Sequence, residues 1–432
     1  MRCVKFCRAI HACVIAMASL TASAAYLQGT TDKPFLSYRS GEEMVFTLTP
    51  VGMENMLTNG PCLLSWTRAG DDGVKDGGTI PFARLPFVYR TRINKPGFVF
   101  LGAHFVTTNG TFYFSKGVPV PPFFAGGAAA DVEKLEPVAE PADFDAFWRR
   151  QRERLEKVPV FERRKAIGET ANARIYAVEV DCAGPRPVTG YLTVPRRCEK
   201  GEKVAAKLQM LGYSSSLQKC PADGDSRYVV LTVNAHGMKL PAFGGDEATH
   251  KYFEFEIRSN GKSYAFDKEQ NRDPETSYFN GMALRVMRAL QYLKTLPEWN
   301  GKDLWASGGS QGGLQTIWAA GCGEGVTEAR CNVIWCCDFA GETVGRHKGG
   351  WRVPWSEGLG YYDPVYFGRR IPRTCHVDVF RAGMGDYISP PCGIMMLWNA
   401  MKCPGHILFD QGGTHGYVPP AYPGRDVSFT RQ

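Results

Sequence analysis

The sequence lacks the features that would indicate a metalloenzyme, a nucleotide-binding protein or a membrane protein. No stretch reaches the run of about 20 apolar residues that a membrane-spanning helix needs. There is no His-Glu-x-x-His motif, no P-loop and no Rossmann glycine fingerprint. There is also no Cys-x-x-Cys pair, which argues against a zinc ribbon or a thioredoxin-type site. We therefore expect no metal, no cofactor and no membrane insertion.

Charge is not concentrated anywhere in the chain. Lys and Arg number 51 against 43 Asp and Glu, for a net charge of +8, and no basic block or stripe accompanies this excess. We therefore expect no nucleic-acid partner. What is present is an ordinary globular composition, 44% hydrophobic and 12% aromatic, over 432 residues, enough for two or three domains.

The first 24 residues have the order of a secretory signal peptide. Residues 2–8 carry three positive charges, residues 13–18 are apolar, and Ala22-Ser23-Ala24 is a small-x-small cleavage site. We expect a secreted or periplasmic protein. Three of the 14 cysteines lie in this segment, so the mature chain keeps an odd number and at least one unpaired thiol.

Residues 35–117 consist of short β-like runs separated by turn residues, with no helical periodicity between them. Such runs at such spacing are typical of a β-sandwich. We expect an immunoglobulin-like sandwich domain over residues 26–120, followed by a linker over residues 121–140 that contains Gly126-Gly127. The expected strands lie at residues 44–48, 63–67, 87–89, 97–101 and 111–114.

The hydrophobic pattern changes at residue 141, where a third segment, residues 141–432, begins. Apolar strands alternate there with helical stretches, which predicts an α/β domain whose mainly parallel sheet has helices on both faces. The pattern predicts helices from residue 144 and over 282–293, a hairpin over 174–194, and strands at 205–211, 229–233, 304–307, 333–337, 377–380 and 407–409.

The most specific motif is Gly308-Gly309-Ser310-Gln311-Gly312, a G-x-S-x-G between an expected strand and an expected helix. A serine on such a tight turn presents an exposed hydroxyl, and flanking glycines allow the close approach of strand and helix. Because a serine hydroxyl is a weak nucleophile, it needs a base and a group that orients the base. The motif therefore predicts that Ser310 is a nucleophile.

His415 is the expected base. Of the four histidines after Ser310, His347 lies in a charged stretch, and His376 and His406 each start an expected strand, at the wrong edge of a parallel sheet. His415 follows the last expected strand, in a loop at the carboxyl edge.

Asp386 is the expected acid, because it follows the strand before the one that leads to His415. Asp338, at the end of an earlier expected strand, is the rival. Asp410 is close to His415 in sequence but falls at a strand end.

The attacked carbonyl would gain negative charge and would need backbone N–H donors. We expect these from Gln311, which follows the serine, and from Tyr213, in the loop after an early strand. His236 and His250, with Asp246 and Glu247 nearby, have no metal-ligand spacing that we can justify, so we expect solvated loop residues there.

Four segments resemble the acetyl xylan esterase/cephalosporin C deacetylase family in sequence, order and spacing: Pro141-Ala142-Asp143-Phe144-Asp145-Ala146-Phe147-Trp148, Leu211-Gly212-Tyr213, Leu293-Lys294-Thr295-Leu296-Pro297-Glu298-Trp299, and Gly308-Gly309-Ser310-Gln311-Gly312-Gly313. The resemblance covers roughly residues 130–425. It implies an α/β-hydrolase fold, hydrolysis of acetyl esters on sugars without metal or cofactor, and the roles given above to Ser310, Asp386, His415, Tyr213 and Gln311.

The chain departs from the family at two motifs and in its domain content. Asn234-Ala235-His236-Gly237 stands where the family usually has Arg-Gly-Gln-Gly, and Gly416-Tyr417 follows the histidine where an acidic residue is common. The N-terminal β domain is an addition to the compact members.

The sequence therefore predicts a secreted serine carboxylic-ester hydrolase that deacetylates oligosaccharides or polysaccharides through a Ser-His-Asp triad, with a homo-oligomer left open. We expect the sandwich to shape or cover the active-site entrance. One alternative is an exported peptidase of prolyl-oligopeptidase type, although about 85 N-terminal β residues cannot form that family's propeller. The other is a non-catalytic carbohydrate-binding protein on a hydrolase scaffold.

Overall fold

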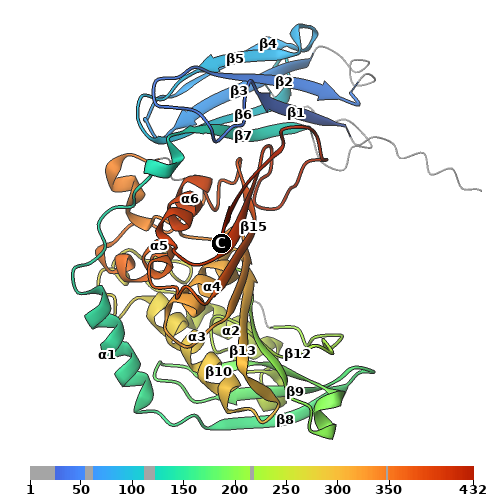
Figure 1. Cartoon of the computed structure of the whole chain (residues 1–432), viewed down its shortest axis with the longest axis vertical. Coiled ribbons are helices and arrows are strands. Elements are labelled where there is room, and N and C mark those ends of the chain that lie inside the picture. The colour runs from blue at the N-terminus through green and yellow to red at the C-terminus, as the bar shows by residue number, and fades with distance from the viewer. Residues whose placement is uncertain (1–24, 54–61, 111–121, 215–217, 347–348) are drawn as a thin grey trace, which may run out of the picture.

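A ten-stranded mixed sheet dominates the computed structural model, which describes residues 25–53, 62–110, 122–214, 218–346 and 349–432 (Figure 1). Its strand order is β17-β16-β15-β14-β13-β11-β12-β10-β9-β8. The six strands from β12 to β16 in this order pair in parallel, and the outer strands pair antiparallel. The strands are β8 (Glu162–Glu169), β9 (Ala173–Val180), β10 (Val188–Pro195), β11 (Val204–Met210), β12 (Tyr228–Val233), β13 (Trp299–Gly309), β14 (Glu328–Asn332), β15 (His376–Gly383), β16 (Gly405–Asp410) and β17 (Asp426–Arg431).

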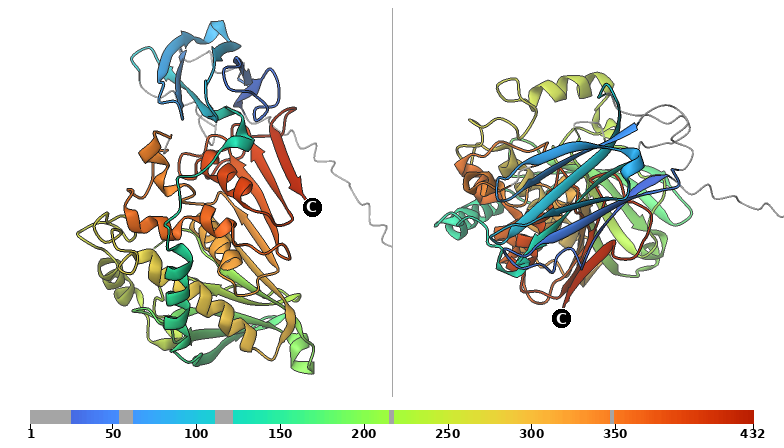
Figure 2. Two further views of the ribbon diagram at one scale, coloured as in Figure 1. Left: turned by 60° about the vertical axis from the view of Figure 1, so that its left-hand side comes forward. Right: turned by 90° about the horizontal axis from the view of Figure 1, so that it is seen from above.

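Five helices pack against one another in a single layer on one face of this sheet (Figures 1 and 2). They are α1 (Phe144–Glu156), α3 (Tyr278–Thr295), α4 (Gln311–Gly321), α5 (Pro364–Gly368) and α6 (Pro391–Ala400), and a further helix is α2 (Glu247–Glu256). Alternation along β11 explains this: Val204, Ala206 and Leu208 are buried, whereas the residues between them are partly or fully exposed. The α/β-hydrolase class is confirmed; of the two faces expected to carry helices, these five helices cover one.

Two antiparallel sheets precede this domain. One has the order β1-β2-β5, and the other has the order β4-β3-β6-β7. Their buried side chains, such as Phe46, Leu64 and Phe98, form the core between them. The strands are β1 (Tyr26–Thr31), β2 (Met44–Val51), β3 (Cys62–Gly70), β4 (Asp76–Pro81), β5 (Phe87–Thr91), β6 (Gly97–Thr107) and β7 (Phe123–Ala130).

Residues 121–140 are not a simple linker. Residues 123–130 form β7, which pairs over its full length with residues 97–104 of β6 and completes the second N-terminal sheet. Glycine and alanine dominate this strand, which is why its sequence does not indicate a strand, but Gly127 is needed because a Cβ there would lie 2.3 Å from the Val99 carbonyl oxygen. The expected strand at residues 111–114 lies outside the described residues.

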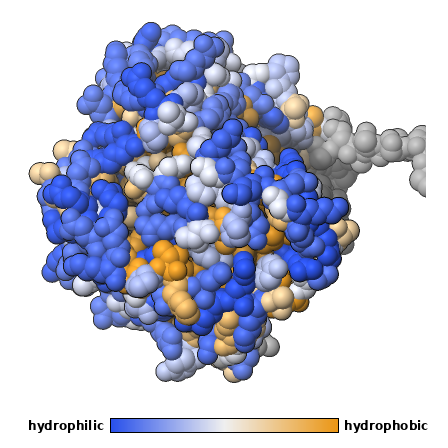
Figure 3. Space-filling model, turned by 60° about the horizontal axis from the view of Figure 1, so that its bottom comes forward, coloured by the Kyte–Doolittle hydropathy of each residue, from blue (hydrophilic) through white to orange (hydrophobic). Residues whose placement is uncertain are grey.

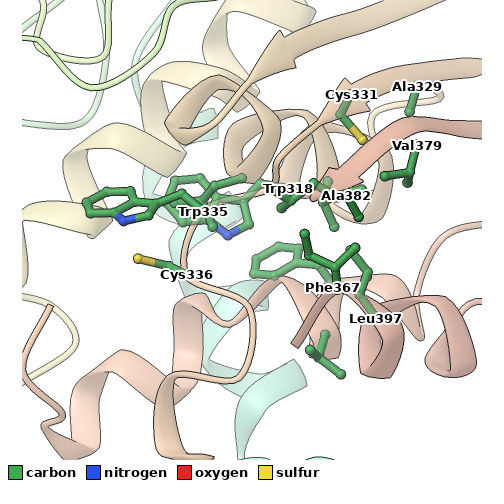
Figure 4. Packing of buried hydrophobic residues seen from close by; sticks show 14 of the residues in the cluster. Trp318, Ala329, Cys331, Trp335, Cys336, Phe367, Val379, Ala382 and Leu397 are labelled. Atoms are coloured by element: carbon green, nitrogen blue, oxygen red, sulfur yellow. The ribbon is translucent and has the colours of Figure 1, made fainter. Parts of the chain in front are cut away.

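Residues 333–337 also differ from our expectation, because they form a buried turn rather than a strand. The strand β14 ends at Asn332, and Val333 and Cys336 have φ angles of 41° and 63°, which no strand contains. Trp335 is fully buried beside Trp318 of α4, in a core that also includes Cys331, Val379 and Leu397 (Figure 4). Short apolar runs of this kind cannot be told from strands by periodicity.

In the described residues, neither the surface nor the cysteines indicate a further function. None of the helices there is long and apolar enough to cross a membrane. All eleven cysteines there are unpaired. The face seen in Figure 3 is mostly hydrophilic, and its hydrophobic residues form small patches, as on ordinary protein surfaces.

The N-terminal sheets join the large domain through β7. Gln411, directly after β16, accepts a hydrogen bond from the Gly127 amide at 2.8 Å and donates one to the Gly127 carbonyl at 2.7 Å. Gln411 is buried, and the Tyr422 hydroxyl donates to the Gly29 carbonyl nearby. This joint attaches the sandwich directly to the loop that leads to His415.

Replacing Gln411 by Ala should lower the free energy of unfolding by about 2–4 kcal/mol, because both buried backbone groups of Gly127 lose their partner. Gln291→Ala is the control, because that side chain is only partly buried and makes a single hydrogen bond, to Glu324. Denaturant unfolding of both variants measures the difference. Equal losses of stability in the two variants would show that the hydrogen bonds between Gln411 and Gly127 stabilise the protein no more than the hydrogen bond of Gln291 does.

Candidate active site

Ser310 lies at the turn between β13 and α4, in a backbone conformation that serine rarely adopts. Its φ and ψ angles are 57° and −120°. Two hydrogen bonds hold this turn: the Ser310 amide donates to the Asn332 carbonyl at 3.1 Å, and the Trp335 amide donates to the Ser310 carbonyl at 3.1 Å. The strained turn lifts the serine side chain out of the strand, at the carboxyl edge of the sheet.

The glycines around Ser310 are required by close backbone contacts. A Cβ on Gly308 or Gly312 would lie 2.6 Å or 2.3 Å from the Met210 carbonyl oxygen of the neighbouring strand β11. A Cβ on Gly309 would lie 2.4 Å from the Asn332 side-chain oxygen. The three glycines of the run therefore follow from how tightly β11, β13, β14 and α4 approach one another.

The structure brings Ser310, His415 and Asp386 into one hydrogen-bond chain. His415 Nε2 lies 2.9 Å from Ser310 Oγ, and His415 Nδ1 lies 2.9 Å from Asp386 Oδ2. The other carboxylate oxygen, Asp386 Oδ1, accepts from the amides of Ile388 and Ser389, both at 2.8 Å. Because a carboxylate held in this way only accepts, His415 carries its proton on Nδ1 and offers Nε2 as the acceptor.

Asp386 and His415 differ in burial in a way that suits proton transfer. The Asp386 side chain is 0% exposed, whereas that of His415 is 21% exposed. The carboxylate is therefore shielded from water, and the imidazole can reach a bound molecule.

The two alternative candidates for the acid, Asp338 and Asp410, form ion pairs with arginines. Asp338 is paired with Arg346, whose Nε donates at 2.8 Å, and its burial raises the pKa of the carboxyl to about 7. Asp410 lies buried beneath Gly413, where burial raises its pKa to about 6, and forms an ion pair with Arg381 at 3.4 Å. In the described residues, the His415 ring forms its hydrogen bond with Asp386 and not with either of these carboxylates.

The other histidines lie as the strand order predicts. His376 begins β15 and His406 lies at the start of β16, at the edge of the sheet opposite Ser310. His347 lies outside the described residues. Among the described histidines, only His415 contacts Ser310.

Two contacts that sequence reasoning missed hold the loops of Asp386 and His415. Arg381 of β15 donates from Nη2 to the Tyr417 carbonyl at 2.6 Å, and also to the Thr414 carbonyl. Gly385 packs against β7 so closely that a Cβ would lie 2.0 Å from the Ala125 carbonyl oxygen. The only available signal for the first contact was an arginine directly after the predicted strand at residues 377–380.

Tyr213 and Gln311, the two expected oxyanion donors, follow neighbouring strands of the sheet, β11 and β13. Gln311 is the first residue of α4, so its amide has no acceptor within the helix. Tyr213 follows β11, whose last residue, Met210, pairs with Gly308 of β13. The Tyr213 ring also packs in an aromatic cluster with Tyr264, Phe266, Trp335 and Trp351.

A cleft of about 890 Å³ opens where the N-terminal sheets meet the loops of Asp386 and His415. It has mostly apolar walls, and Gly385, Tyr387 and Gly416 line one side. Phe105 of β6 and Phe123 of β7 line the other. The sandwich therefore forms one wall of a cleft beside these two loops.

The expectation of a solvated His236 is wrong. Its side chain is buried, with Nδ1 at 2.8 Å from the Tyr278 hydroxyl and Nε2 at 2.7 Å from the Ser214 carbonyl. His250 is partly exposed and lies beside Met238. Within the described ranges, no group of three or more His, Cys, Asp or Glu side chains could hold a metal ion.

Replacing Gly312 by Ala should abolish the site, because its Cβ would overlap a backbone oxygen that cannot move without separating β11 from α4. We expect a loss of stability of about 3 kcal/mol or more and at least a 100-fold loss of ester hydrolysis. Gly168→Ala is the control, because nothing lies within 4 Å of its added Cβ. Normal hydrolysis by Gly312→Ala would contradict the packing argument.

The chain is similar to known acetyl esterases in sequence and in fold. The family model described as acetyl xylan esterase (AXE1) matches residues 133–344. The acetyl esterase Axe7A of Xylanibacter ruminicola is 26% identical over 406 residues, which are 88% of this chain and 84% of that protein.

Solved structures show the fold. An acetyl xylan esterase from Paenibacillus sp. R4 superposes with a TM-score of 0.55 at 20% identity, over 67% of this chain and 94% of its own. Acetyl xylan esterase 1 from Thermoanaerobacterium sp. JW/SL YS485 gives a TM-score of 0.53 at 16% identity, over 66% and 93%. On these matches, residues 133–344 are similar to the acetyl xylan esterase family, and the large domain has the α/β-hydrolase fold of these solved structures.

Proposed function

We propose that this protein is a secreted serine esterase that removes acetyl groups from oligosaccharides or polysaccharides. The similarity of residues 133–344 to the acetyl xylan esterase family and of the chain to an acetyl esterase supports a carboxylic-ester hydrolase. The observation that carries the serine mechanism is the hydrogen-bond chain from Ser310 Oγ through His415 to Asp386, with both distances at 2.9 Å.

Acylation begins at Ser310. Its hydroxyl oxygen attacks the ester carbonyl carbon while His415 Nε2 takes the hydroxyl proton. Asp386 accepts from Nδ1–H, which keeps Nε2 free for this proton and stabilises the imidazolium that forms. The amides of Tyr213 and Gln311 donate to the oxyanion of the tetrahedral intermediate. The intermediate collapses as His415 returns the proton to the sugar oxygen, which leaves as an alcohol.

Deacylation repeats these roles with water. His415 removes a proton from a water molecule, which attacks the acetyl carbonyl on Ser310. The second tetrahedral intermediate releases acetate, and the serine oxygen recovers its proton from His415. Ordinary acid–base chemistry of these side chains completes the cycle.

The cleft beside the two loops supports a sugar-chain substrate. Phe123, Tyr387 and Tyr417 give it aromatic surface, and its volume of about 890 Å³ exceeds what an acetyl group needs. Tyr417, two residues after His415, packs on Phe123 with ring centroids 5.1 Å apart. In our proposal the sandwich forms the outer wall of the site and holds the alcohol part of the ester. Export by the N-terminal segment, which lies outside the described residues, would bring the enzyme to such substrates.

Asp386→Asn should lower kcat by about a thousandfold or more, because the amide would favour the wrong tautomer of His415. Asp338→Asn should keep kcat, because its carboxylate pairs with Arg346. Hydrolysis of 4-nitrophenyl acetate by the two folded variants measures this. A large loss in Asp338→Asn with none in Asp386→Asn would reverse the assignment.

A fluorophosphonate probe should label the wild-type protein and fail to label Ser310→Ala, because only an activated serine reacts. Acetate release from acetylated xylan, peracetylated sugars and acetylated pectin tests the substrate, with chromogenic dipeptides as the peptidase control. Cleavage of the dipeptides alone would contradict the substrate class. Labelling of folded Ser310→Ala would contradict the nucleophile.

A further inference from the structure

The two proposed oxyanion donors come from separate segments of the chain. Gln311 begins α4, whereas Tyr213 lies in the loop after β11. Two donors stabilise an oxyanion only if their N–H groups are fixed relative to each other before the charge develops. Some contact must therefore tie the loop of Tyr213 to the start of α4.

One buried residue, Tyr264, contacts both segments. Its hydroxyl donates to Gln311 Oε1 at 2.9 Å and accepts from the Ser214 amide at 3.1 Å. Its ring stacks on that of Tyr213 at 4.2 Å and 12°, and its carbonyl accepts from the Tyr213 hydroxyl at 3.3 Å. Tyr264 is 2% exposed, so water does not compete for these bonds.

Tyr264 is itself held rigidly. The next residue, Ala265, has a φ angle of 69°, and its carbonyl accepts from Asn271 Nδ2 at 2.7 Å. Asn271 in turn accepts from Ser277, whose side chain caps the N-terminus of α3. The hydroxyl of Tyr264 is thus fixed in position relative to the long helix α3 of the core. A hydroxyl held in this way can position other groups.

His236 supports the same loop from the other side. Burial lowers its pKa to about 3, so the ring is neutral. Because the Ser214 carbonyl can only accept, Nε2 carries the proton, and Nδ1 accepts from the Tyr278 hydroxyl. The His236 ring also meets the Tyr264 ring edge-on at 4.4 Å.

The backbone around His236 fixes this ring in place. Asn234 Oδ1 accepts from the amides of His236 and Gly237, at 2.8 Å and 3.1 Å. Arg285 donates twice to the Ala235 carbonyl, at 3.0 Å and 2.7 Å. The segment Asn234-Ala235-His236-Gly237 thus forms a rigid support under Ser214.

We propose that Tyr264 is a positioning residue that sets the distance between the Tyr213 and Gln311 amides, and that His236 supports it through the Ser214 carbonyl. This inference rests on the proposed serine-esterase mechanism. Tyr264 does not touch the reacting atoms, so its removal should weaken stabilisation of the tetrahedral intermediate and leave binding of the ester in place.

Tyr264→Phe tests this, because it keeps the ring stack and removes only the hydroxyl. With 4-nitrophenyl acetate, kcat should fall about 10- to 100-fold while KM changes less than about twofold. Phenylboronic acid, which forms a tetrahedral adduct with an active serine, should lose affinity by about the same factor as kcat/KM.

Tyr366→Phe is the matched control. Tyr366 is equally buried, and its hydroxyl makes one hydrogen bond, to the Val138 carbonyl at 2.8 Å, away from the site. It should lose stability and keep kcat. A second pair, His236→Gln and His236→Met, separates positioning from folding: glutamine keeps a donor for the Ser214 carbonyl and should retain more of kcat than methionine at equal thermal stability.

Folded Tyr264→Phe with wild-type kcat, or with a change in KM alone, would overturn the inference, as would equal kcat in the two His236 variants. If Tyr264→Phe does not fold, the His236 pair decides. A wild-type protein that hydrolyses no ester would instead overturn the proposed function, and this inference with it.

Discussion

The active site depends on the strained backbone of Ser310. A positive φ at a residue with a side chain costs free energy, and here hydrogen bonds from both flanks and the packing of β11 against α4 compensate for it. Those contacts need glycine at positions 308, 309 and 312. The turn at residues 333–337 belongs to the same arrangement, because the Trp335 amide completes the hydrogen bonding of Ser310. The strain is thus the reason for several otherwise unusual residues.

The N-terminal sandwich helps to hold the active-site loops in place. Its last strand, β7, contacts the Asp386 loop through Gly385 and the His415 loop through Gln411. Both loops leave the carboxyl edge of the sheet. Such a contact couples the order of the two loops to the folding of a domain that carries no proposed reacting group.

A one-sided helix layer shapes the rest of the molecule. The parallel strands bury one row of side chains under α3 and α4 and leave polar residues such as Lys207 and Arg330 on the other side. A buried polar scaffold then forms behind the Tyr213 loop, where Tyr264, His236 and Tyr278 satisfy one another. Satisfied networks of this kind hold loops in one conformation, as a site for a developing charge requires.

The sequence by itself predicted the fold class and the strand ends that place Ser310, Asp386 and His415 at one edge, because these follow from local periodicity and from motifs of adjacent residues. Tertiary structure alone decided that residues 123–130 complete a sheet, that residues 333–337 turn, and that the five helices named above cover one face of the large sheet. It also decided the positions of Arg381, Tyr264 and His236. Each of these side chains acts through partners far away in the chain, and no local pattern encodes such a partner until the sheet has brought the segments together.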